Sequence, residues 1–147
     1  MKQNGIYHSE LSLAVSKMGH GDIILIGDVG CAWPQHGQTT CIDLAVSDGI
    51  PMVKDVLAAV LQELVVERYI VAEETIAVSP ESYQALKAVL SKSKCQGHPV
   101  AECVSSHQVM KELWLHGALN GDQMKVFIRT GERTPYGYIM LVAGVDF

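Results

Sequence analysis

The sequence predicts a single α/β domain over residues 1–147, a three-layer α/β/α arrangement with a mostly parallel or mixed central sheet. Two observations lead to this prediction. Short apolar runs bounded by glycine or polar residues alternate with longer amphipathic segments, as in chains whose helices cover both faces of a sheet. The length of 147 residues fits one domain, and a hydrophobic content of 48% can form a substantial core.

The first predicted helix covers residues 9–18, where apolar side chains recur at helical spacing, and Gly19 is expected to end it. Residues 23–27 form an apolar run that predicts a short buried strand. Residues 28–40 contain glycines and a proline but no apolar period, so we expect a loop there. A short strand is expected over residues 41–46.

The middle of the chain repeats this alternation. Pro51 stands near the start of a helix that runs to about residue 64 along an apolar stripe. Residues 68–72 predict a strand that ends in two glutamates. Ser79, Pro80 and Glu81 then form a strong helix start, with a cap, a proline in the first turn and an acidic side chain. This helix is expected to continue to about residue 91.

The last part of the chain predicts three strands and one helix. A strand over residues 99–104 is followed by a helix over residues 107–115, which Ser105 or Ser106 caps. Strands over residues 125–128 and 138–142 close the chain. These two strands follow each other directly, so we expect them to pair antiparallel and make the sheet mixed.

The net charge, the hydropathy and the cysteine spacing argue against several classes of protein. The formal net charge is −5 with scattered Lys and Arg, which argues against a nucleic-acid surface or an acidic-membrane surface. No apolar run approaches the ~20 residues of a membrane span. The N-terminus lacks the apolar core of a signal peptide, and no pair of the four cysteines forms a C-x-x-C motif. We therefore expect a cytoplasmic protein with reduced thiols and no metal site.

His20 is the first candidate for catalysis. An imidazole can donate and accept a proton near neutral pH. The predicted helix end before it would favour the protonated ring, and Gly19 and Gly21 would let a ligand approach closely. The alternative is a histidine that caps the helix. Asp22 is either the partner that orients His20 or a cap of the next segment.

Further polar candidates stand at the ends of predicted elements, where α/β proteins collect their chemistry. Asp28 follows the first strand and can accept hydrogen bonds from neighbouring hydroxyls, or else is a turn residue. His107 and Lys111 are four residues apart and share a helix face, which is either a binding face or merely exposed. Tyr136 and Tyr138 point to the same side of the last strand.

Trp33, in the loop after Asp28, is a candidate for stacking on a sugar ring, or else anchors the loop in the core. The chain has no G-x-G-x-x-G motif, no Walker lysine and no H-x-x-x-H motif. Together these residues favour proton transfer on a small polar molecule over nucleotide or metal chemistry.

Taken in order, these motifs resemble the ribose pyranase and fucose mutarotase family over nearly the whole chain. The most specific stretch covers residues 128–136, with the letters IRTGERTPY. The other stretches that carry the resemblance are residues 18–22, 28–30 with Pro34, 42–45, 49–51, 72–74, 106–107 with Lys111, and 143–145.

The resemblance implies an α/β/α enzyme that interconverts anomers or ring forms of a free monosaccharide without a cofactor. It implies that His20 is the proton donor and that Asp28, His107 and residues 136–138 bind the sugar. It also implies a homo-oligomer, often a decamer in this family, with the site near a subunit interface.

The sequence departs from the family pattern at several positions. Tyr138 stands where the family has asparagine, Cys41 where an arginine is frequent, and Trp33 lies in an unusual loop. His107 and residues 72–74 look ribose-type, whereas Gly21 and Trp33 look fucose-type. The sequence therefore leaves both ribose and fucose as candidate substrates. One hypothesis is that Trp33 and Tyr138 cover the methyl group of a 6-deoxy sugar.

Two other functions compete with this interpretation. A non-catalytic sugar-binding accessory of an uptake system would use the same pocket without needing His20. A metal-dependent sugar isomerase would need at least three converging His or carboxylate ligands.

Overall fold

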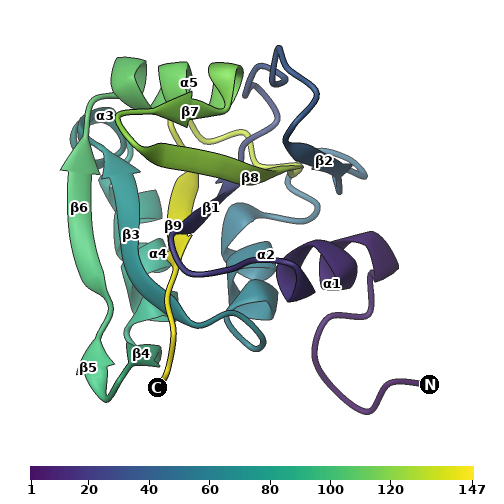
Figure 1. The fold of residues 1–147 in the computed structure, drawn as a ribbon. Coiled ribbons are helices and arrows are strands. Elements are labelled where there is room, and N and C mark those ends of the chain that lie inside the picture. The colour runs from purple at the N-terminus through teal and green to yellow at the C-terminus, as the bar shows by residue number, and fades with distance from the viewer.

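A seven-stranded mixed sheet runs through the middle of the computed structural model, which describes residues 1–147 (Figure 1). Its strands are β1 (Asp22–Gly27), β2 (Thr40–Asp43), β3 (Val66–Ala72), β6 (Ala101–Ser105), β7 (Ala118–Leu119), β8 (Asp122–Arg129) and β9 (Ile139–Ala143). The order is β2-β8-β1-β9-β3-β6, and β7 pairs with β8 at the side. Strand β9 runs antiparallel to both of its neighbours, while the β2-β8, β8-β1 and β3-β6 pairs are parallel.

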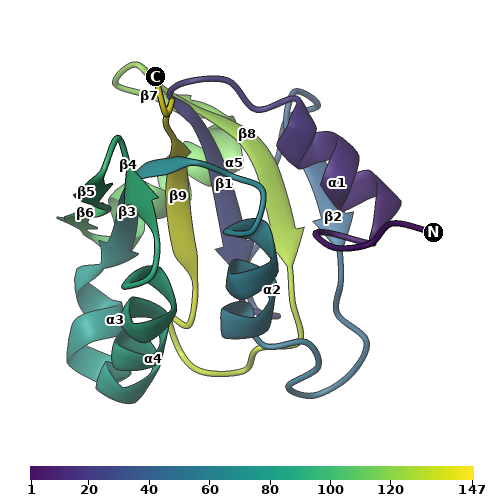
Figure 2. The same cartoon turned by 90° about the horizontal axis from the view of Figure 1, so that it is seen from below.

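Helices cover both faces of this sheet. They are α1 (Ser9–Ser16), α2 (Val53–Val60), α3 (Glu73–Val78), α4 (Pro80–Leu90) and α5 (His107–His116). Figure 2 shows α1, α2 and α4 on one side of the sheet and α5 on the other. This confirms the predicted three-layer α/β/α class. None of the helices combines the length and the apolar character needed to cross a membrane.

Alternating side chains of β1 explain the two layers. Ile24 and Ile26 pack into the larger apolar cluster with α1, α2 and α4, whereas Ile23 and Leu25 pack into the cluster with α5. All four side chains are fully buried, as the period of two along a strand requires when both faces are covered. Strand β1 is therefore central to the fold, and the position where it ends is fixed.

The C-terminal strands correct one prediction. The sheet is mixed, as predicted, but β8 and β9 do not pair with each other, because β1 lies between them. The chain from residue 130 to residue 138 instead passes over the end of β1 and returns as β9 on its other side. This crossing segment therefore becomes part of the surface at that end of the sheet.

Other differences concern short elements. Helix α1 ends at Ser16, two residues earlier than predicted, and its last turn tightens through a bond from the Met18 amide to the Val15 carbonyl. Helix α3, strand β7 and the separate hairpin of β4 (Lys94–Cys95) and β5 (His98–Pro99) were not predicted. Elements of two to six residues are too short to show an apolar period.

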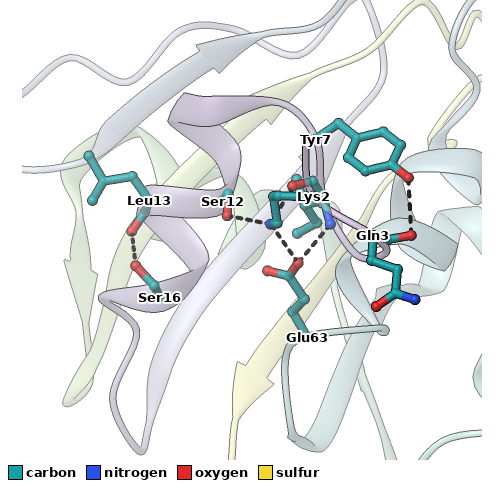
Figure 3. Close-up of polar contacts among 8 residues, drawn as sticks. Lys2, Gln3, Tyr7, Ser12, Leu13, Ser16 and Glu63 are labelled. Atoms are coloured by element: carbon teal, nitrogen blue, oxygen red, sulfur yellow. Dashed lines mark hydrogen bonds and ion pairs between the residues drawn. The ribbon is translucent and has the colours of Figure 1, made fainter.

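The N-terminal segment is tied to the body of the domain by one carboxylate (Figure 3). Glu63 Oε1 accepts hydrogen bonds from the Ile6 amide at 2.6 Å and from Lys2 Nζ at 3.3 Å, and Lys2 Nζ also donates to Ser12 Oγ at 3.2 Å. The bond from the Ile6 amide, followed by Lys2, lowers the pKa of Glu63. These contacts join the segment before α1 to Ser12 and Glu63, and none of these residues lines the pocket described next.

Candidate active site

A pocket of about 330 Å³ opens at the edge of the sheet where β1, β3, β6 and β8 end and β9 begins. This is the edge at which parallel sheets hold their ligands. The residues that line it come from the loop after β1, from α5 and from the segment between β8 and β9. They are Asp28, Val29, Gly30, Cys31, Ala32, His107, Lys111, Trp114, Glu132, Arg133, Thr134, Pro135, Tyr136 and Tyr138.

Asp28 stands directly after β1 and lines this pocket. Its Oδ1 accepts a hydrogen bond from the Gly30 amide at 2.8 Å, which closes a tight turn. Burial raises the pKa of Asp28 above its ordinary value of 3.8, and the hydrogen bonds from Gly30 and Cys31 only partly oppose this. A carboxylate held in such a place is a strong acceptor for ligand hydroxyls.

His107 and Lys111 come from the first turns of α5 and share one helix face, as their spacing predicts, and both line the pocket. The His107 amide donates to Glu74 Oε2 at 2.8 Å, and its ring Nδ1 lies 2.6 Å from the Tyr138 hydroxyl. The Lys111 ammonium has no hydrogen bond or ion pair within the chain. The pocket therefore offers a fixed imidazole, an unpaired cation and the Asp28 carboxylate among its lining groups.

The segment that carries Tyr136 is held in an unusual conformation. Tyr136 has φ +55°, a left-handed value that few residues other than glycine adopt. The buried Thr75 hydroxyl donates to the Tyr136 carbonyl at 2.8 Å, and the buried Ser79 hydroxyl donates to the Pro135 carbonyl at 2.6 Å. Contrary to the prediction, the Ser79 side chain does not cap α4. It fixes the pocket wall instead.

Sequence reasoning missed a buried carboxylate of the pocket wall. Glu132 is only 5% exposed, and its carboxylate accepts bonds from the Thr134 hydroxyl at 2.7 Å and the Val53 amide at 3.4 Å. It thereby joins the crossing segment to the start of α2. Cys31 is also buried, and burial raises the pKa of its thiol, so it is held as a neutral thiol beside Asp28.

His20 lies outside this pocket. It precedes β1, whereas Asp28 follows it, so the six residues of the strand separate them by about 20 Å. His20 is four residues beyond the end of α1, so the helix end does not act on it as predicted. Its ring Nε2 instead lies 2.9 Å from Glu67 Oε2, and its side chain is 60% exposed. Asp22 accepts from the Gly19 amide at 2.8 Å and does not orient the histidine.

Trp33 is likewise not among the residues that line the pocket. Its ring packs against Phe127 with centroids 5.2 Å apart and remains 45% exposed, so it acts as a partial loop anchor in the single chain. Tyr138, by contrast, lines the pocket and is buried. No three His, Cys, Asp or Glu side chains of the chain lie where they could hold one metal ion together.

This arrangement can be compared with known proteins. The model of the RbsD / FucU transport protein family matches residues 1–146. The chain belongs to this family. Curated RbsD/FucU relatives named D-ribose pyranase include one from Paracidovorax citrulli, 40% identical over 147 residues, and one from Clostridium perfringens (strain SM101 / Type A), 37% identical over 147 residues. Both alignments cover 100% of each chain.

Solved structures of the family agree with the fold. Bacillus subtilis RbsD complexed with D-ribose is 33% identical, with a TM-score of 0.83 and complete coverage of both chains. The fucose mutarotase of Streptococcus pneumoniae in complex with L-fucose has a TM-score of 0.65 at 16% identity, over 97% of this chain and 100% of that one. The second comparison supports the fold alone. The family resemblance inferred from the sequence is thus confirmed.

Proposed function

We propose that this protein is an isomerase that interconverts ring forms of free D-ribose by opening and closing the sugar ring. The observation that carries the proposal is the polar pocket at the strand ends, in a chain 37–40% identical over its full length to proteins named D-ribose pyranase. The pocket is lined by the acceptor Asp28 and by His107 and Lys111. These are the groups that a small polyhydroxy ligand needs, and none of them requires a cofactor.

The proposed reaction is a redistribution of protons. The anomeric hydroxyl loses its proton as C1=O forms, the bond from C1 to the ring oxygen breaks, and that oxygen gains a proton. Closing by another hydroxyl gives the other ring size, and closing after rotation of the aldehyde gives the other anomer. No atoms or electrons are gained, so one acid and one base suffice. Positioned groups of this kind supply about 10²- to 10⁴-fold acceleration.

His20 remains our proposed acid, but a single chain places it about 20 Å from Asp28. We therefore propose a homo-oligomer, expected to be a decamer, in which His20 of one subunit reaches the pocket of the next. The exposed His20 with its Glu67 partner supports this. So do the exposed apolar side chains Val46 and Ile50 in the segment beside the pocket.

D-ribose is favoured over L-fucose as the substrate. The hypothesis that Trp33 and Tyr138 together cover a sugar methyl group loses support, because Trp33 packs on Phe127 outside the pocket of its own chain. Glu74, which belongs to a ribose-type stretch, fixes the first amide of α5 and hence His107. We also propose a cytoplasmic location, in keeping with four free cysteines.

Saturation-difference NMR of ring-form exchange tests the proposal on D-ribose and L-fucose. The wild type should accelerate exchange of D-ribose above the buffer rate, and His20→Ala should abolish the acceleration. His116→Ala is a matched control, because His116 is 55% exposed and pairs with Glu112 at 3.2 Å, much as His20 pairs with Glu67. Full activity of His20→Ala would overturn its assignment as acid. Binding without acceleration would instead indicate a sugar-binding accessory.

A further inference from the structure

The floor of the pocket contains a hydrogen bond that does not involve the ligand. The Tyr138 hydroxyl lies 2.6 Å from Nδ1 of His107, and Tyr138 is 1% exposed. The phenol ring packs edge-on against Trp114 with centroids 5.3 Å apart. Tyr138 stands where the family pattern has asparagine, so this contact belongs to the present chain. The inference drawn from it deepens the proposed function and rests on it.

The Tyr138 hydroxyl hydrogen has a single available acceptor within the chain. His107 Nδ1 is the only hydrogen-bond partner of this oxygen within the chain. Burial, together with nearby Cys31 and Glu74, raises the pKa of Tyr138, so the phenol keeps its proton. If Nδ1 also carried a hydrogen, the buried hydroxyl hydrogen would lack an acceptor, which is costly. The hydroxyl therefore donates and Nδ1 accepts.

The other ring nitrogen of His107 is then the one that bears hydrogen. Nε2 has no hydrogen-bond partner within the chain. Every buried side-chain nitrogen or oxygen of the chain does have such a partner, so Nε2 is not buried. Nε2 is therefore accessible, and since His107 lines the pocket, it is accessible from there. The backbone of His107 is fixed as well, through the bond from its amide to Glu74. Both the ring and the main chain of this residue are thus held before a ligand arrives.

We propose that Tyr138 is a positioning residue that holds His107 as the neutral Nε2–H tautomer, so that the pocket presents a fixed hydrogen-bond donor to the sugar. A fixed donor selects an oxygen that can accept. The ring oxygen and the aldehyde oxygen of the open form can only accept, so they suit it best. Asp28, which also lines the pocket, only accepts when it is ionised. The pocket therefore binds one acceptor group and one donor group of the sugar, and this fixes the orientation of the sugar.

The tautomer can be measured in the free protein by long-range ¹H–¹⁵N NMR of the histidine ring. We expect His107 Nδ1 to resonate as an unprotonated nitrogen and Nε2 as a protonated one. Tyr138→Phe keeps the ring and removes the hydroxyl, and should give a mixture of tautomers. Tyr83→Phe is the control, because its hydroxyl bonds to Glu102 on α4's side of the sheet, away from the pocket.

The kinetic consequence is a change in KM rather than in kcat. Loss of one oriented hydrogen bond should raise KM for D-ribose about threefold to tenfold in Tyr138→Phe, with kcat changed less, while Tyr83→Phe keeps both constants. A wild-type His107 protonated at Nδ1 would overturn the proposal, as would an unchanged tautomer and KM in Tyr138→Phe. The NMR result needs no turnover. If the wild type isomerises neither sugar, the proposed function fails while the tautomer is still decided.

Discussion

Replacing Asp28 by asparagine separates the contribution of this residue to sugar binding from its effect on the stability of the folded state. Asparagine keeps the oxygen that accepts from the Gly30 amide at 2.8 Å and removes the charge. Because burial raises the pKa of Asp28, the ionised side chain destabilises the folded state at neutral pH. Asp28→Asn should therefore be more stable than the wild type at pH 7 and less active.

The size of the activity loss follows from the change of acceptor. Hydrogen bonds to a charged group contribute about 1.5–3 kcal/mol and those to a neutral group about 0.5–1.5 kcal/mol. Two neighbouring sugar hydroxyls that donate to Asp28 would thus lose about 2–3 kcal/mol together. This corresponds to a fall of kcat/KM of roughly 30- to 150-fold.

Two measurements check this prediction. Ring-form exchange by NMR gives kcat/KM, and thermal unfolding gives Tm at several pH values. The stability advantage of Asp28→Asn should be largest at neutral pH, where the wild-type carboxyl is ionised. It should shrink as the pH falls through the raised pKa and vanish below the ordinary value of 3.8, because the wild-type side chain is then protonated in both states.

Asp43→Asn is the matched control. Asp43 also ends a strand and accepts a backbone amide two residues on, from Ala45 at 3.0 Å, but it is exposed and pairs with Arg129. Its replacement should give no gain in Tm. The reasoning about Asp28 would be refuted if Asp28→Asn were destabilised at pH 7 by the ~1 kcal/mol typical of point substitutions, or if kcat/KM were unchanged.

The remaining predictions concern groups around the pocket and its partner. Glu67→Gln should lower kcat/KM about twofold to fivefold, because it removes an exposed pair with His20, and unchanged exchange rates would show that Glu67 does not orient the ring. Gly131→Ala should lower the free energy of unfolding in denaturant by about 1–3 kcal/mol, since a Cβ there would lie 2.6 Å from the Ile50 amide nitrogen, and wild-type stability would contradict this. The Cys31 thiol should react with iodoacetamide more than about tenfold slower in the folded than in the unfolded protein, because burial raises its pKa. Peptide mass spectrometry measures both rates, and equal rates would show that the folded protein does not protect the thiol.

Much of the fold could be predicted because its main signals are local. The apolar run before Asp28 predicted β1 and its exit, and the spacing of His107 and Lys111 placed both on one helix face. The pairing of β8 and β9 could not be predicted, because the insertion of β1 between them depends on the packing of residues distant in sequence. Alternation predicts which strands exist, but not which strands are neighbours.

The candidate site shows the same limit. His20 and Asp28 are close in sequence, yet an intervening strand of six residues places them at opposite edges of the sheet. Glu67, which pairs with His20, lies 47 residues further along and carries no local signal. Glu132 lies in the stretch of residues 128–136 that carries the resemblance most specifically, but its contact with Val53 joins residues 79 positions apart and leaves no local signal.

Complementation between two impaired variants tests the central claim, that the active site combines the pocket of one subunit with His20 of another. His20→Ala and Asp28→Asn would be co-expressed and the mixed oligomers assayed for ring-form exchange of D-ribose. Random assembly leaves about half of the pockets and half of the His20 positions intact, so about one quarter of the sites should regain wild-type activity. Mixed oligomers no more active than the average of the two separate variants would contradict the account.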